Sequence, residues 1–205
     1  MTTLPDRADI VIIGGGIVGC SVAYHLTKLG LNDVVLFERK QLTCGTTWHA
    51  AGLVGQLRAS KNMTRLAQYS TELFANLAAE TGQETGYQAT GSMTLALNAE
   101  RLEELKRQAT MANAFNVACE LIGPDFVQER WPGIDTSDVY GGVYLPGDGQ
   151  TNPVDTTLAL AKGARSAGAK IFENTPVQRL AIENGRVIGV YLDNDTLVRA
   201  RQVVI

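Results

Sequence analysis

Near its amino terminus the chain reads Ile10-Val11-Ile12-Ile13-Gly14-Gly15-Gly16-Ile17-Val18-Gly19. The first four residues are apolar and β-branched, a pattern typical of a strand that is buried on both faces. After the glycines, apolar residues recur at helical spacing and predict a helix that ends near Gly30. A second buried strand is predicted over 33–37, so this region forms a strand-turn-helix-strand unit of about 30 residues.

The glycines of this run have the spacing of a dinucleotide-binding turn. Gly14 permits the tight turn, Gly16 lets the backbone approach a pyrophosphate, and Gly19 lets the helix pack closely on the strand. The phosphates are then expected at the positive end of the helix. Glu38 follows the second strand, where a carboxylate accepts hydrogen bonds from a ribose diol. The sequence therefore predicts a dinucleotide site, and this motif alone leaves both FAD and NAD open.

Composition excludes several other classes of protein. The chain has 205 residues and a net charge of −3, which argues against a nucleic-acid binder or a membrane-surface binder. No apolar run approaches the roughly 20 residues of a membrane span. Two histidines are too few for an ordinary multi-histidine metal site, so no metal is predicted. Three cysteines without CxxC spacing indicate reduced thiols and a cytoplasmic protein.

The rest of the chain alternates between helical and strand patterns. Helices are predicted over 62–80, from Asn98 through about 112, over 124–131 and over 153–167. Strands are predicted over 88–97, 139–145 and 170–173, followed by a meander over 177–182, 187–192 and 197–199 with turns at Asn184-Gly185 and Asn194-Asp195. The last five residues, Arg201–Ile205, continue as a strand without a turn or cap, which predicts a fragment of a longer protein.

The loop after the second strand supports a flavin over a nicotinamide. It reads Leu42-Thr43-Cys44-Gly45-Thr46-Thr47-Trp48-His49-Ala50-Ala51-Gly52-Leu53 and resembles the flavin loop of the D-amino-acid-oxidase-like FAD oxidoreductases. More narrowly, the run from Gly45 resembles the sarcosine and dimethylglycine dehydrogenase/oxidase group. The resemblance extends over essentially the whole chain, through Glu80-Thr81-Gly82, Tyr140-Gly141-Gly142 and Pro146-Gly147-Asp148-Gly149.

This resemblance implies an α/β fold with two domains. A doubly wound, Rossmann-like FAD-binding domain would comprise 1–87 and 146–205, and would be incomplete. An α+β substrate domain with antiparallel strands would begin in the insertion 88–145. The early glycine unit and the later meander would then belong to one domain, although they lie far apart in the sequence.

The resemblance also implies which residues contact FAD. His49 would be bonded covalently to the 8-methyl carbon of the flavin, as in the sarcosine and dimethylglycine group. Val177 would meet the adenine through its backbone. The full set of implied contacts comprises Gly14, Gly16, Ile17, Val18 and Gly19 at the pyrophosphate, Glu38 and Arg39 at the ribose, Gly45, Thr46, Thr47, Trp48, His49, Ala50, Ala51, Gly52 and Leu53 around the flavin, and Val177.

The implied reaction is oxidative N-demethylation of a small N-methylated amino acid such as sarcosine or dimethylglycine. Hydride would pass from the N-methyl carbon to flavin N5, leaving an iminium that is hydrolysed or captured by tetrahydrofolate. A folate site would lie beyond Ile205. The residues point to no catalytic base and no particular electron acceptor.

Three alternatives remain open at this point. Another amine or α-hydroxy-acid oxidase of the same fold would share Glu38 and the glycine turn but have no reason for His49. An NAD-dependent dehydrogenase would lack the loop 45–53. The third alternative is a nucleotide-binding module without activity.

Residues near the motif also have structural interpretations. His49 by spacing alone would be a surface residue, and its covalent role depends on the resemblance. We expect structural roles for His25 and Cys20 on the first helix and for Cys44 before the flavin loop.

Overall fold

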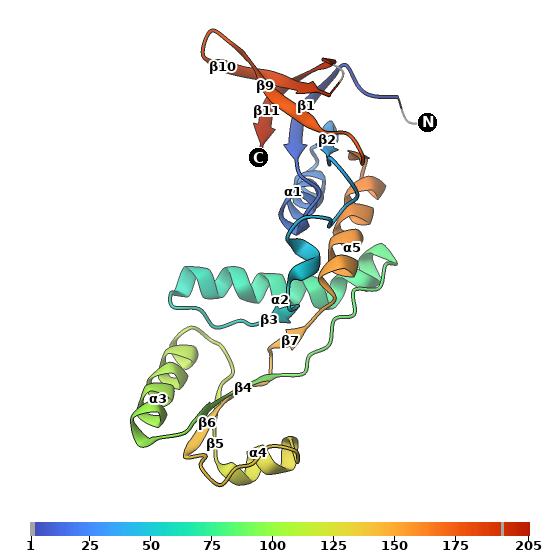
Figure 1. Ribbon diagram of the computed structural model, residues 1–205. Coiled ribbons are helices and arrows are strands. Elements are labelled where there is room, and N and C mark those ends of the chain that lie inside the picture. Colours follow the sequence, from blue (N-terminus) through green and yellow to red (C-terminus); the bar gives the residue numbers. More distant parts are fainter. Residues whose placement is uncertain (1–2, 194) are drawn as a thin grey trace. The chain divides into compact units, whose positions relative to one another are not determined.

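The computed structural model describes residues 3–193 and 195–205 and divides the chain into two compact units (Figure 1). The first unit contains the residues up to Ala51, Asn76–Gly86 and Asn152–Ile205. The second unit contains Gly52–Ala75 and Tyr87–Thr151. Asn194 of the predicted Asn194-Asp195 turn lies outside the described residues.

The first unit is built on one six-stranded sheet, whose strands other than β8 are labelled in Figure 1. Its strand order is β8-β2-β1-β11-β10-β9. The first four of these strands pair in parallel, and β10 pairs antiparallel with both β11 and β9. The bounds are β1 Arg7–Ile13, β2 Val34–Phe37, β8 Lys170–Phe172, β9 Val177–Glu183, β10 Arg186–Leu192 and β11 Leu197–Val204. The predicted meander therefore joins the sheet of the glycine unit through β11.

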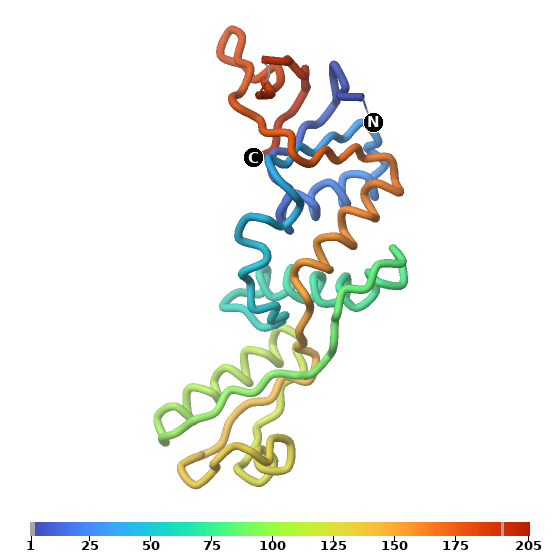
Figure 2. Tube along the Cα trace, turned by 45° about the vertical axis from the view of Figure 1, so that its right-hand side comes forward, coloured from blue at the N-terminus to red at the C-terminus, as the bar shows by residue number. Residues whose placement is uncertain are grey.

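Two helices, α1 (Ile17–Lys28) and α5 (Pro153–Ser166), pack against each other in this unit, and Figure 2 shows their traces side by side. A glycine allows the close approach, because a Cβ at Gly163 would lie 2.8 Å from the ring of Tyr24. The Asn152 side chain begins α5 by accepting hydrogen bonds from the backbone N–H groups of Val154 and Asp155. All four residues of β2 are buried, as the continuous apolar pattern predicted.

The second unit contains a three-stranded antiparallel sheet in the order β4-β6-β5, with strands Ser92–Ala96, Gly141–Leu145 and Glu120–Ile122. Helix α3 (Ala99–Ala114) buries Leu105, Ala109 and Ala112. Helix α4 spans Pro124–Arg130, and a short pair joins β3 (Leu53–Val54) to β7 (Gly149–Gln150). Helix α2 (Lys61–Thr81) has residues in both units.

The predicted boundaries put 52–75 in the dinucleotide unit, whereas the structure groups this segment with the second unit. A buried carboxylate contributes contacts there. Asp148 is 7% exposed and accepts hydrogen bonds from the backbone N–H of Gln56 at 2.8 Å and from Ser92 Oγ at 2.6 Å. These bonds connect the segment before α2 with the strands of the second unit. The grouping also differs from the predicted one at 146–151.

The predicted strand over 88–97 is shorter in the structure. It pairs continuously over Ser92–Ala96, preceded by an isolated bridge between Gln88 and Gln150. Gly91 has a φ of +72°, which interrupts the extended backbone. Among the described residues, no helix combines the length and the apolar character needed to cross a membrane.

Candidate functional site

A cavity of about 350 Å³ lies in the first unit where the parallel strands β1 and β2 end. Ligands of open α/β sheets bind outside the carboxyl ends of such strands. We call it the β1–β2 cavity. It is lined by Ile13, Gly14, Gly16, Phe37, Glu38, Arg39, Cys44, Gly45, Thr46, Thr47 and Val177. Eight of the predicted site residues, separated by up to 163 positions, therefore meet here.

The turn between β1 and α1 has the geometry for which its glycines were singled out. Gly14 has a φ of +109°, and its N–H donates to the carbonyl oxygen of Phe37 at 2.9 Å. A Cβ at Gly19 would overlap the carbonyl oxygen of Gly14, so the helix can begin this close to the strand only with glycine there. The turn is thereby folded tightly against both strands.

The amino-terminal end of α1 opens beside this turn. Gly16 precedes the helix and supplies no side-chain cap, but Thr47 Oγ1 accepts a hydrogen bond from the backbone N–H of Ile17 at 3.0 Å. A second hollow of about 220 Å³ is lined by the same turn and by Ile17, Val18 and Gly19. N–H groups of a first helical turn attract phosphate groups. The predicted pyrophosphate residues thus surround a helix terminus with open space beside it.

Glu38 is a buried carboxylate held by several donors. It is 7% exposed, and its Oε2 accepts from the backbone N–H of Gly15 at 2.6 Å. Its Oε1 accepts from the backbone N–H of Lys40 at 2.9 Å and from Cys44 Sγ at 3.4 Å. Burial raises the pKa of the Glu38 carboxyl, but the bonds from Gly15, Lys40 and Cys44 outweigh burial and lower the pKa below its usual value. A negative charge is therefore stable at the end of β2.

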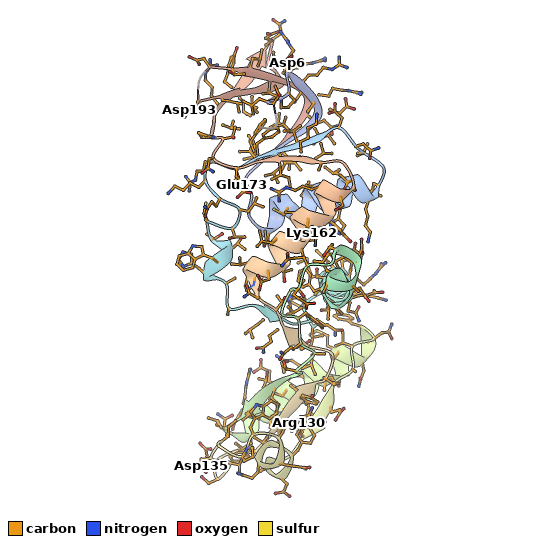
Figure 3. The ribbon with its side chains drawn as sticks, turned by 90° about the vertical axis from the view of Figure 1, so that its right-hand side faces the viewer. Asp6, Arg130, Asp135, Lys162, Glu173 and Asp193 are labelled. Atoms are coloured by element: carbon orange, nitrogen blue, oxygen red, sulfur yellow. The ribbon has the colours of Figure 1, made fainter. Side chains whose placement is uncertain are left out.

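The flavin-type loop is attached to the glycine turn through its backbone. Thr43 N–H donates to the carbonyl oxygen of Gly15 at 2.9 Å. Leu42 N–H donates at 2.9 Å to Glu173, which is labelled in Figure 3 and also pairs with Arg165 at 3.3 Å. The loop then forms a short 3-10 helix, η1, over Thr47–His49. This attachment carries the loop from β2 to the start of α1.

The remaining predicted flavin contacts are not part of the cavity lining. Trp48 and His49 lie on η1 with exposed side chains, and their ring centroids are 3.8 Å apart. Ala50 and Ala51 are exposed as well. The structure places Gly52 and Leu53 in the second unit, at the start of β3. The contacts of all six residues from Trp48 to Leu53 with FAD stay predictions.

The residues expected to be structural have partners that fit such roles. Cys20 is fully buried, and burial raises the pKa of its thiol to about 12, so it packs as a protonated, small side chain. His25 Nδ1 is 2.7 Å from the carbonyl oxygen of Ser21 within α1. Cys44 differs, because its thiol contacts Glu38 and lines the β1–β2 cavity.

Sequence analysis missed Gly15 as well as Cys44. A Cβ at Gly15 would lie 2.9 Å from Cβ of Glu38 and would meet Leu42, so this position excludes larger residues. The signal was present in the three consecutive glycines, but the motif requires only the first and the third of them. No group of three or more histidine, cysteine, aspartate or glutamate residues suited to a metal ion occurs within the described ranges.

These residues fit a dinucleotide. The space beside Gly14 is open, the start of α1 borders the second hollow, and the charged Glu38 lies at the end of β2. Val177, at the start of β9, lines the same cavity as Glu38 and Arg39. A phosphate site, a ribose carboxylate and an apolar residue are what an ADP moiety requires.

Comparison with known proteins agrees with this geometry. Residues 9–205 match the family described as DAO, FAD dependent oxidoreductase. Human mitochondrial dimethylglycine dehydrogenase is 44% identical over 179 residues, which cover 87% of this chain and 21% of that protein. The mitochondrial pyruvate dehydrogenase phosphatase regulatory subunit of Mus musculus is 41% identical over 190 residues, covering 93% and 22%.

The fold has a counterpart among solved structures. The crystal structure of L-proline dehydrogenase from P. horikoshii matches with a TM-score of 0.91 and 32% identity, over 98% of this chain and 52% of that one. The chain thus spans about a fifth of the curated relatives and about half of this solved chain. With 197 of its 205 residues matched by the family, the chain belongs to the DAO family of FAD dependent oxidoreductases.

Proposed function

We propose that this chain is the FAD-binding part of an enzyme that oxidises a small N-methylated amino acid, sarcosine or dimethylglycine, by oxidative N-demethylation. The observation that carries the proposal is the β1–β2 cavity, whose lining joins the glycine turn and Glu38 to the start of the loop 45–53. The 44% identity with dimethylglycine dehydrogenase, over 87% of this chain, supports the substrate class.

The residues of the first unit divide the binding of FAD between them. The turn at Gly14 and Gly16 and the N–H groups of α1 would hold the pyrophosphate. Glu38 would accept a hydrogen bond from the adenosine ribose, and the Val177 backbone would meet the adenine. When bound, FAD supplies the two-electron acceptor for oxidation of the substrate's N-methyl carbon.

We further propose that His49 carries the flavin covalently. Its imidazole is exposed on η1, two residues beyond Thr47, whose hydroxyl is bonded to α1. An exposed ring on a loop attached at both the glycine turn and the helix start can reach a ligand and still be held in place. A covalent bond at this position would fix the isoalloxazine ring relative to the substrate.

The products follow from the chemistry of the substrate. Loss of a hydride from the N-methyl carbon leaves an iminium, and water converts it to the demethylated amine and formaldehyde. Tetrahydrofolate would capture the one-carbon unit in a part of the intact protein outside residues 1–205.

The three cysteines without a CxxC pair favour a reducing, cytoplasmic location, which cell fractionation tests.

The deciding experiment measures turnover by the intact protein. Sarcosine, dimethylglycine and L-proline are each supplied with an artificial two-electron acceptor, and acceptor reduction and formaldehyde are followed together. We expect formaldehyde in equal amount to reduced acceptor with sarcosine or dimethylglycine. If L-proline were oxidised and the two N-methylated amino acids were not, the protein would belong to another class of amine-oxidising enzyme. A purified protein without a flavin spectrum would contradict FAD binding itself.

A second candidate is a FAD-binding module without turnover. The observation that favours it is the 41% identity with a regulatory subunit over 93% of this chain. The same experiment separates the two candidates, because a module of this kind would show the flavin spectrum but no reduction of the acceptor with any of the three amines.

A further inference from the structure

Cys44 lies beside Glu38 in the β1–β2 cavity, where sequence analysis expected an ordinary structural residue. Its Sγ donates to Oε1 of Glu38 at 3.4 Å, and both side chains line the cavity. Glu38 is more than nine-tenths buried, so its orientation is set by its hydrogen bonds and not by water. The thiol is therefore one of the groups that determine where this carboxylate points.

One of the two carboxylate oxygens of Glu38 can accept a further hydrogen bond from a ligand. An ionised carboxylate has two oxygens with about four lone-pair positions. Among the described residues, Oε1 accepts hydrogen bonds from two donors, Lys40 N–H and Cys44 Sγ. From the same residues, Oε2 accepts a hydrogen bond from one donor, Gly15 N–H. Both positions of Oε1 are thus occupied, and one position of Oε2 remains for a ligand.

The thiol differs from the other two donors in kind. Gly15 and Lys40 donate from the backbone, so their bonds are present whatever side chains they carry. Cys44 contributes the one side-chain donor to Glu38 that the described residues contain. A substitution at Cys44 therefore removes one donor to Glu38 and leaves both backbone donors in place.

The loop adopts a costly conformation that brings the thiol to this place. Thr43 has a φ of +71°, which β-branched residues rarely adopt. Its N–H donates to Gly15 O at 2.9 Å, and Cys44 N–H donates to Gln41 O at 3.3 Å. Such backbone conformations persist where the surrounding contacts hold them and concentrate at functional sites. The turn directs Cys44 back towards Glu38.

We propose that Cys44 is a positioning residue for nucleotide recognition: its thiol holds Oε1 of Glu38 so that Oε2 is presented to the 2′-hydroxyl of the adenosine ribose. This inference rests on the proposed FAD binding, and it is independent of the amine that the enzyme oxidises. The thiol does not contact the nucleotide in this arrangement and acts through the carboxylate.

The test compares ADP with 2′-deoxy-ADP as ligands of the intact, flavin-free protein, prepared on a His49→Ala background. We expect the parent protein to prefer ADP. Cys44→Ala should weaken ADP binding by about 3- to 10-fold, in the range of a lost hydrogen bond, and leave 2′-deoxy-ADP nearly unchanged. Cys44→Ser keeps a donor and should restore the preference to within about twofold. Cys119→Ala, in the second unit, is the matched cysteine control and should leave the dissociation constants of both nucleotides unchanged.

Each other result overturns the inference. Tighter ADP binding by Cys44→Ala would mean that the thiol competes with the ribose for Glu38. Equal weakening of both nucleotides would mean a general structural role, and an unchanged preference would mean no role. If the parent protein binds neither nucleotide, the FAD proposal fails with it. If the parent protein prefers ADP and Cys44→Ala shows the same preference, this inference fails and the FAD proposal stands.

Discussion

Thr47 Oγ1 accepts a hydrogen bond from the backbone N–H of Ile17 at 3.0 Å across 30 positions of sequence. The hydroxyl takes the place of a helix cap, because Gly16 at the start of α1 supplies no side chain. Thr47 is buried and also lines the β1–β2 cavity. One side chain thus joins the loop that carries His49 to the helix terminus at which phosphate is expected.

Removing this hydroxyl should destabilise the protein. Thr47→Val keeps the shape of the side chain but leaves Ile17 N–H without its acceptor, at a cost of about 1–2 kcal/mol in the free energy of unfolding. Urea denaturation of the intact protein measures it. Thr47→Ser should recover most of the loss, and Thr46→Val, at an exposed neighbour, should change stability by less than about 0.5 kcal/mol. Equal effects at both positions would contradict the capping role.

A methyl group at Gly19 should disrupt the glycine turn. Its Cβ would overlap the carbonyl oxygen of Gly14, so α1 would have to move away from β1. We expect Gly19→Ala to lose about 2–3 kcal/mol of stability and to bind FAD poorly. Gly45→Ala is the matched control for stability, because nothing lies within 4 Å of a Cβ there. A stable Gly19→Ala protein with normal flavin content would refute this account of the turn.

Glu38 should make the stability of the protein sensitive to acid. The folded-state pKa of its carboxyl is lowered, so its contribution is fully present above the unfolded value of about 4.5 and is lost as pH falls through the folded pKa. The difference in unfolding free energy between the parent protein and Glu38→Gln should therefore be constant above about pH 5.5 and shrink below pH 4.5.

Denaturant titrations between pH 3 and pH 7 would measure this difference, with the exposed Glu183→Gln as the control. A difference that grows on acidification would have the wrong sign. Glu38→Ala should in addition weaken the uptake of FAD at limiting FAD by about 1–3 kcal/mol, because it removes a buried partner of the ribose.

Substitution of His49 tests whether the flavin is attached covalently. If the proposed bond exists, the unfolded intact protein keeps yellow fluorescence on a denaturing gel. His49→Ala should lose the fluorescence but retain some FAD, because the glycine turn and Glu38 do not involve the imidazole. Its amine oxidation should slow, since the flavin is less firmly positioned. Trp48→Ala is the control at the stacked neighbour and should keep the fluorescence. Release of all flavin by acid from the parent protein would defeat the covalent assignment.

Local patterns in the sequence were sufficient for the elements around the site. The run Ile10–Gly19 predicted β1, the tight turn and α1, and the apolar run before Glu38 predicted β2. The loop 45–53 carried the resemblance to the FAD oxidoreductases, which the family match confirmed. Periodicity and glycine spacing depend on residues close together in the chain, so they can be read without knowledge of the fold.

The tertiary structure decided which of these residues meet. It inserted β11 between β1 and β10, brought Thr47 to Ile17, and directed Cys44 and Gly15 N–H onto one carboxylate. It also grouped 52–75 with the second unit and joined Gln56 to Asp148. None of these contacts has a periodic signature, because each depends on how strands pair, helices pack or a loop turns. Even Cys44 and Glu38, which are six positions apart, meet through the turn at Thr43. Such contacts satisfy buried polar groups, and which donor reaches which acceptor is determined only when the chain has folded.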